Sequence, residues 1–254
     1  MTTHGRAARA TSGPAPTLQR AALLQAMAHA FAYPEAGHKG RVQARLRRLR
    51  PAGERVADRS LRRAIAGARH AWASVSEDAL RAHYGALFLG SGPCPLRETA
   101  YGDGRRIAGR TAELSDIGGF YAAFGVRPSA VEPDLPDHLC SELEFCSMLL
   151  LKLAHAQARG SASKRRVVAR ALRAFMHDHL GRWPDAFARE LARAAGESPY
   201  RPLAAAVALA TRIEARRCGA RPRPMAGRPA DDPMQEEGLN CPRQSGHRPE
   251  KPGR

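Results

Sequence analysis

Several features that mark common protein classes are scarce or absent in this sequence of 254 residues. Its five cysteines form no CxxC pair, so the sequence indicates neither a disulfide framework nor a zinc finger, and reduced thiols fit it best. No stretch approaches the roughly 20 consecutive apolar residues of a membrane-spanning helix. Aromatic residues make up only 6%, and alanine, leucine and arginine, which favour helix, dominate instead. The composition therefore predicts an all-α fold.

Motifs of the familiar enzyme classes are also absent, including GxSxG, HExxH and a Walker-type phosphate loop. His138, Cys140 and Glu142 are spaced two apart, which directs their side chains away from each other on a helix and argues against a metal site. The same spacing separates Glu142 and Glu144 as an acid/base pair. Cys94 has no histidine assignable as its base. The sequence thus predicts a protein that is not an enzyme and that has no cofactor and no metal.

Positive charge is the strongest compositional signal, with a formal net charge of +17. Much of it lies in the basic amphipathic patterns at 39–50 and 54–71. In the first of these, Val42, Leu46 and Leu49 keep helical spacing while arginines fill the other face. Such a run is either a solvated helix face or a surface for nucleic acid. No zinc-finger spacing or RNA-binding aromatic signature accompanies it, so nucleic-acid binding stands as the alternative function.

Periodicity and breakers divide the chain into three parts. We expect a disordered extension at 1–16, one helical domain of about eight or nine helices at 17–217, and a disordered tail at 218–254 that contains Cys218 and Cys241. The expected helices cover about 17–32, 39–50, 54–71, 77–89, 107–124, 139–158, 164–179, 185–195 and 200–217. We interpret the alanine-rich start of the first as a domain helix, because Gln25 and His29 interrupt its apolar run.

An acidic turn followed by an amphipathic helix, EPDLPDHLCSELEFCSMLL at 132–150, is the most informative segment. Pro133 and Pro136 favour an extended turn, because proline fixes φ and disfavours helix at the preceding residue. Asp137 is the expected N-cap of the helix, and the carboxylates after it suit the positive end of the helix dipole. The segment is more typical of a docking surface than of a catalytic cleft.

Three segments in order resemble the TorD/DmsD/NarJ family of redox-enzyme maturation chaperones. The first is YGALFLG at 84–90 with PCPLRETAY at 93–101; the second is PDHL at 136–139 with ELEF at 142–145; the third runs from Phe175 through His179 and Trp183 to Phe187 and Tyr200. The central segments are most similar to the branch that serves periplasmic molybdenum enzymes of the dimethylsulfide or ethylbenzene dehydrogenase type. The sequence departs from the family pattern at Thr99-Ala100 and in the missing spacer before Pro184.

This resemblance implies a cytoplasmic, all-helical chaperone that binds the twin-arginine signal peptide and the apo-form of a molybdopterin oxidoreductase. Such a chaperone assists insertion of the molybdenum cofactor before export and binds no cofactor itself. Molybdenum-cofactor biosynthesis proteins are further expected partners. The expected oligomeric state is a monomer or a dimer.

The resemblance also implies a binding site with an acidic part and an apolar part. The two signal arginines would pair with carboxylates beside a histidine, and the hydrophobic segment would enter a groove. The expected site residues are Asp137, His138, Glu132 and Glu142 for the first part, and Tyr84, Leu87, Phe88 and Tyr101 for the second. The alternatives are that Asp137 and His138 only stabilise the hinge, and that Tyr84 and Phe88 belong to the core. His179 and Trp183 are expected to be structural.

Overall fold

The computed structural model describes residues 13–48, 59–102, 107–127 and 135–227. Within these ranges the chain forms nine α-helices, one 3₁₀ helix and no strand, which confirms the all-α prediction. The helices are α2 (Pro14–Phe31), α3 (His38–Arg48), α4 (Arg59–Ala73), α5 (Glu77–Phe88), η2 (Glu98–Ala100), α6 (Ile107–Ala123), α7 (Leu139–Ala158), α8 (Ala162–Asp178), α9 (Pro184–Ala194) and α10 (Tyr200–Cys218). None of these helices is long and apolar enough to cross a bilayer.

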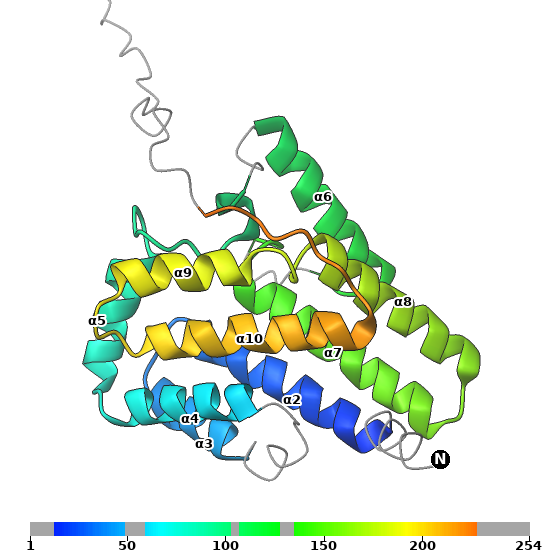
Figure 1. Cartoon of the computed structure of the whole chain (residues 1–254), viewed down its shortest axis with the longest axis horizontal. Coiled ribbons are helices and arrows are strands. Elements are labelled where there is room, and N and C mark those ends of the chain that lie inside the picture. Colours follow the sequence, from blue (N-terminus) through cyan, green and yellow to red (C-terminus); the bar gives the residue numbers. More distant parts are fainter. Residues whose placement is uncertain (1–12, 49–58, 103–106, 128–134, 228–254) are drawn as a thin grey trace, which may run out of the picture.

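Helices α2 and α7 lie antiparallel along much of their length (Figure 1). Cys140 Sγ donates to Ala28 O at 3.2 Å, and Ser147 Oγ donates to Ala21 O at 2.9 Å. Residue numbers therefore rise along α7 as they fall along α2, which shows that the two helices run in opposite directions. Small alanines on α2 allow this close approach. The pair forms the centre of the core.

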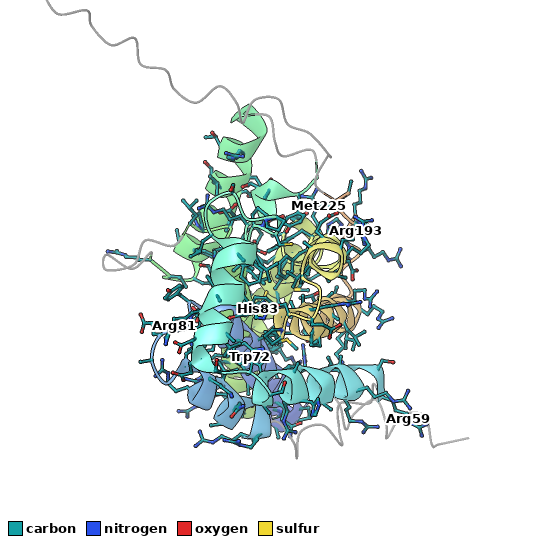
Figure 2. All side chains as sticks on the ribbon, turned by 90° about the vertical axis from the view of Figure 1, so that its left-hand side faces the viewer. Arg59, Trp72, Arg81, His83, Arg193 and Met225 are labelled. Atoms are coloured by element: carbon teal, nitrogen blue, oxygen red, sulfur yellow. The ribbon has the colours of Figure 1, made fainter. Side chains whose placement is uncertain are left out.

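The remaining helices cover this central pair. Helix α10 packs on α4 and on α9, and α8 packs along α7, whereas α6 projects from the body (Figure 1). Trp72 is fully buried where α4 meets the core, while Arg59 and Arg193 point away from the body (Figure 2). The arginine-rich faces of α3 and α4 are thus the outer faces of packed helices, as their periodicity predicts.

Both ends of the expected domain differ from the predicted boundaries. Helix α2 begins at Pro14, earlier than expected, because proline at the first turn of a helix needs no backbone N–H. Beyond α10, Met225 is 7% exposed, and its N donates to Arg182 O at 2.9 Å. Residues 219–227 were expected in the tail because they lack periodicity, yet they lie extended against the body and are part of it.

Candidate functional site

Two segments far apart in sequence pair through their backbones at the start of α7. Glu98 N donates to Asp137 O at 2.9 Å, and Leu139 N donates to Leu96 O at 2.9 Å. These bonds form a short antiparallel bridge. The bridge joins the first two motif segments, so that η2 lies beside the first turn of α7.

The Asp137 carboxylate is fully buried within this junction. Its Oδ2 accepts hydrogen bonds from the Thr99 hydroxyl at 2.6 Å and from Thr99 N at 3.3 Å. His138 is the N-cap of α7 instead, since its Nδ1 accepts from Cys140 N at 3.3 Å. The prediction that Asp137 caps this helix is wrong, because the tertiary bonds to Thr99 engage its carboxylate.

Two further carboxyl groups, those of Glu98 and Glu142, are buried beside this junction. Neither side chain has solvent-exposed surface, and the two carboxyl groups are close enough to interact electrostatically. Trp183 Nε1 donates to Glu142 Oε2 at 3.1 Å, but within the described ranges no donor reaches Oε1 of either glutamate. Burial raises the pKa of Glu142 well above its usual range, and the Glu98 charge raises it further. The pair therefore needs a shared proton or a nearby cation.

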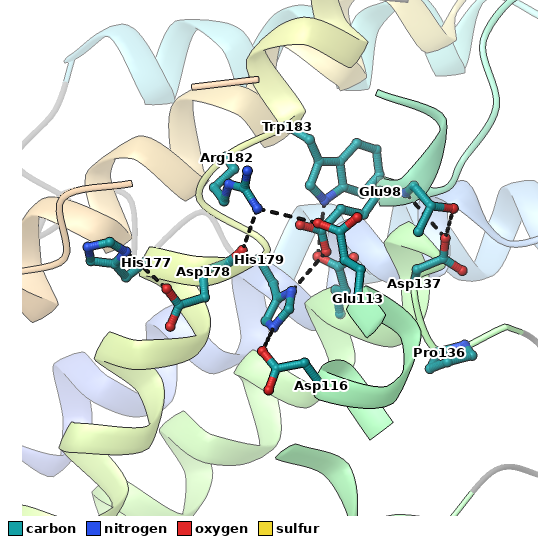
Figure 3. A network of polar contacts seen from close by, with 12 residues as sticks. Glu98, Glu113, Asp116, Pro136, Asp137, His177, Asp178, His179, Arg182 and Trp183 are labelled. Carbon is teal, nitrogen blue, oxygen red and sulfur yellow. Dashed lines mark hydrogen bonds and ion pairs between the residues drawn. The ribbon is translucent and has the colours of Figure 1, made fainter. Parts of the chain in front are cut away.

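His179, just after α8, connects these buried acids to the surface (Figure 3). Its Nδ1 lies 3.2 Å from Glu98 Oε2, and its Nε2 lies 3.0 Å from Asp116 Oδ2 on α6. Burial alone would lower the pKa of His179, but the hydrogen bonds and charges of Glu98 and Asp116 outweigh it and raise that pKa. Asp116 is 63% exposed, so the network opens to solvent on this side.

Arg182 and Glu113 form the outer edge of the same network. Arg182 Nη1 lies 3.3 Å from Glu113 Oε1 and also donates to Asp178 O at 3.1 Å. The Glu113 side chain is 14% exposed, and burial raises its pKa. Arg182 is thus the permanent cation that this network contains among the described residues. The network as a whole contains the carboxyl groups of Glu98, Glu113, Asp116 and Glu142, more than one guanidinium can neutralise.

The aromatic and apolar residues expected to line a groove lie in the core. Tyr84, Leu87 and Phe88 on α5 and Tyr101 after η2 are each at most 9% exposed. Phe88 packs on Tyr200 with ring centroids 5.1 Å apart, and Tyr101 stacks on Trp183 at 5.4 Å. Their contact with a peptide remains a prediction, and in this conformation all of them fill the interior.

The predicted acidic part of the site is mostly inaccessible as well. Asp137 and Glu142 are fully buried, whereas His138 is partly exposed. Glu132 lies outside the described residues. Of the expected peptide contacts that lie within the described ranges, His138 is therefore the one presented to solvent.

An accessible surface does run along the outer side of α7 from its N-terminus. Glu144 and Leu151 lie seven residues apart on one face of α7 and are both exposed, Leu151 at 45%. His138, the N-cap at the start of this helix, is partly exposed. At Leu151 the surface enters a groove of about 590 Å³ between α7 and α8. The groove is lined by Leu151, Lys152, His155, Ala156, Ser163, Lys164, Val167 and Val168.

Sequence reasoning did not single out Glu98, Glu113 or Asp116 for a role. Glu98 is in the quoted loop motif, so its signal was present, but a charged residue in a loop is usually solvated. His179 and Trp183 were expected to be structural, and their bonds to Glu98 and Glu142 agree with that. What no local pattern could indicate is that all of these side chains meet.

Comparisons with known proteins converge on one family. The model of the nitrate reductase delta subunit family matches residues 51–189, a range that contains all three motif segments except Tyr200. The selenate reductase assembly chaperone protein of Thauera selenatis is 30% identical over 166 residues, which cover 65% of this chain and 73% of that protein. The chlorate reductase assembly chaperone protein of Ideonella dechloratans is 31% identical over 118 residues, which cover 46% and 60%.

One solved structure gives a weaker likeness. A redox enzyme maturation protein from Archaeoglobus fulgidus is 19% identical and has a TM-score of 0.46, with 74% of this chain and 91% of that chain covered.

Proposed function

This chain belongs to the nitrate reductase delta subunit family, which confirms the resemblance to redox-enzyme maturation chaperones, and on that premise we propose that it is an assembly chaperone for a molybdopterin oxidoreductase. The observation that carries the proposal is the match to two proteins named as assembly chaperones, one of selenate reductase and one of chlorate reductase. In this function the chain binds the apo-form of the catalytic subunit and its twin-arginine signal peptide in the cytoplasm. It holds both until the cofactor is inserted.

A role without catalysis is supported by the state of the reactive side chains. Glu98, Glu142 and His179 are at most 2% exposed and are occupied by one another and by Trp183. A substrate would have to displace this packing to reach them. The network instead holds the three family segments in one arrangement.

We place the peptide contact on the outer side of α7, because buried Asp137 and Glu142 are not accessible to it. Glu144 and His138 lie near the start of that surface, and Leu151 and Val167 lie in the groove near its end. A helix rises about 1.5 Å per residue, so Glu144 and Leu151 are about 10 Å apart along α7. That spacing suits a peptide whose arginines pair with Glu144 while the apolar residues that follow enter the groove.

Asp137 stabilises the turn from which this surface begins. By accepting both bonds from Thr99 it fixes the turn that precedes α7, and His138 caps the helix from that turn. The broader surface that contacts the folded apo-enzyme is a second layer of the proposal, for which the exposed apolar groove between α7 and α8 is the candidate.

The test is calorimetric titration with twin-arginine signal peptides of molybdoenzymes encoded nearby, with lysine–lysine versions as the control. We expect micromolar binding that the lysine–lysine peptides lose. Glu144→Gln and Val167→Asp should each weaken binding, whereas Glu197→Gln and Leu89→Asp, which change exposed residues elsewhere, should not. His138→Ala should weaken it more than His70→Ala, which changes an exposed histidine on α4 outside that surface.

Absence of binding to every peptide, together with tight binding to DNA or RNA that weakens steeply with salt, would favour the nucleic-acid alternative. Neither of the two relatives is named as a nucleic-acid-binding protein.

A further inference from the structure

Three potential metal ligands from separate parts of the chain converge at the edge of the buried network. Glu98 comes from η2, Glu113 from α6, and His179 follows α8. One ligand atom from each lies within 4.8 Å of the other two. Figure 3 shows the three side chains directed toward one another, with Asp116 on the far side of the imidazole.

The orientation of His179 is the one found in metal sites. Its Nε2 lies 3.0 Å from Asp116 Oδ2, which suits donation of the Nε2 proton to that carboxylate. Metal-binding histidines usually donate their second ring N–H to a carboxylate in this way, which fixes the tautomer and directs the other nitrogen to the metal. That other nitrogen, Nδ1, faces Glu98 Oε2 at 3.2 Å.

We propose that Glu98, Glu113 and His179 bind a divalent transition-metal ion, with Asp116 orienting the imidazole. Imidazole nitrogen with two carboxylate oxygens suits Zn²⁺ or Mn²⁺, whereas Mg²⁺ and Ca²⁺ prefer oxygen ligands throughout. The ligands are one oxygen of each glutamate and Nδ1 of His179.

The distances fit such an ion with little movement. Ligands at about 2.0–2.2 Å from one tetrahedral ion lie roughly 3.2–3.6 Å from each other. The Nδ1 to Oε2 distance of 3.2 Å between His179 and Glu98 is already at that separation. Glu113 has to approach by up to roughly 1.5 Å, and its side chain, which is 14% exposed, lies at the edge of the network. Arg182 pairs with its Oε1, which leaves Oε2 for the ion.

A second observation points to a cation at this place. Oε1 of Glu98 and Oε1 of Glu142 are fully buried, and no donor among the described residues reaches either atom. The side chain of Glu98 has no exposed surface. The network contains the carboxyl groups of Glu98, Glu113, Asp116 and Glu142, and among the described residues its one permanent cation is Arg182, which pairs with Glu113. A bound ion supplies positive charge that buried acids require.

The proposed metal site is distinct from the outer surface of α7. A protein that binds no metal could therefore still bind the peptide as a chaperone, and a protein that binds no peptide could still bind the metal. Residue spacing within one segment could not predict this site, because its ligands come from three separate segments. His138, Cys140 and Glu142, which share one segment, are not among them.

The experiment is calorimetric titration of the chelator-treated full chain with ZnCl₂ and, separately, with MnCl₂. We expect one saturable site for each ion. Glu113→Gln and His179→Gln should weaken it by about 100-fold and Asp116→Asn by roughly 10-fold. His177→Gln and Asp178→Asn are the matched controls, because both are half exposed and close in sequence but outside the ligand set.

A spectroscopic readout separates this site from thiols or histidines elsewhere. In the Trp72→Phe background, Trp183 is the sole remaining tryptophan, and its indole donates to Glu142 beside Glu98. Its fluorescence should change with the same midpoint as the calorimetric curve.

The inference is overturned if neither ion binds saturably, since a shared proton then satisfies Glu98 and Glu142. It is equally overturned if binding is unaffected by Glu113→Gln. Because Glu113 lies at the edge of the network, this variant can be tested even if His179→Gln does not fold, with circular dichroism as the check.

Discussion

The Thr99 hydroxyl donates a 2.6 Å hydrogen bond to the buried carboxylate of Asp137, which ties the loop before α6 to the turn before α7. Thr99 belongs to one of the two places at which the sequence departs from the family pattern, and Asp137 belongs to a segment that matches it. The departure is thus accommodated by a direct bond between the two motifs. Loss of that bond would leave a buried charge with fewer donors.

We therefore expect Thr99→Val to lower the free energy of unfolding by about 1–3 kcal/mol, because it keeps the side-chain shape but removes the hydroxyl donor. Thr99→Ser keeps the donor and should cost less. Urea unfolding followed by circular dichroism measures both. Equal stability of the valine and serine variants would show that the Thr99 hydroxyl does not stabilise Asp137.

We expect the buried His38 to make the free energy of unfolding depend on pH. Its side chain is 6% exposed, packs on Trp72, and has an Nε2 that no donor or acceptor among the described residues reaches. Burial, followed by the Arg41 charge, lowers the pKa of His38 to about 4. The other charged or titratable groups that act on it are His29, which lowers it further, and Glu77 and Glu35, which raise it.

A histidine whose pKa is lower in the folded state binds its proton more readily in the unfolded state. Its contribution to stability is therefore complete above the unfolded pKa of about 6.5 and is lost as pH falls toward 4. We expect His38→Gln to remove about 1–2 kcal/mol of the acid destabilisation, a value reduced for partial solvent screening. Urea unfolding at pH 7 and 4.5 tests this. If the free energy of unfolding falls by the same amount between pH 7 and pH 4.5 in the wild type and in His38→Gln, the prediction is wrong.

Arg20 and Glu214 form a largely buried ion pair between α2 and α10. Arg20 Nε donates to Glu214 Oε2 at 2.8 Å, Nη2 pairs with Oε1, and the side chains are 15% and 4% exposed. Arg20→Met should cost about 3–5 kcal/mol, because it leaves the carboxylate buried without its partner. The double variant Arg20→Met with Glu214→Met should recover most of that loss. Chemical denaturation of both variants measures the difference.

The exposed pair Arg81–Asp78 is the control for that experiment, since the aspartate is 91% exposed. Its arginine should contribute no more than about 1 kcal/mol. If the double variant is no more stable than Arg20→Met alone, the cost does not arise from the unpaired Glu214 charge.

Gly181 and Gly118 should respond oppositely to alanine. A Cβ at Gly181 would overlap the carbonyl oxygen of Met176, whereas nothing lies within 4 Å of one at Gly118 on α6. We expect Gly181→Ala to destabilise by about 2–4 kcal/mol through the backbone clash. Gly118→Ala should stabilise by about 0.5–1 kcal/mol, because alanine costs less entropy in a helix. Thermal melts of the two variants test both signs, and a stable Gly181→Ala protein would mean that the turn after α8 shifts readily.

Helix α7 shows how far sequence could predict this protein. Its existence and length followed from periodicity and from the two prolines, and the helix ends at Ala158 as expected. Its cap did not follow: Asp137 is the better N-cap by local preference, but Thr99 engages its carboxylate and His138 takes the capping role. Local propensity is overridden here by a contact between residues 38 positions apart.

The sequence by itself determined the helical fold and the family, because apolar periodicity, helix breakers and the three motif segments are properties of neighbouring residues. Only the tertiary structure decided which of those residues are accessible. It buried Tyr84, Phe88, Asp137 and Glu142 and brought Glu98 to His179. Burial and convergence depend on how whole helices pack, and no pattern within one segment encodes which distant carboxylate a histidine will meet.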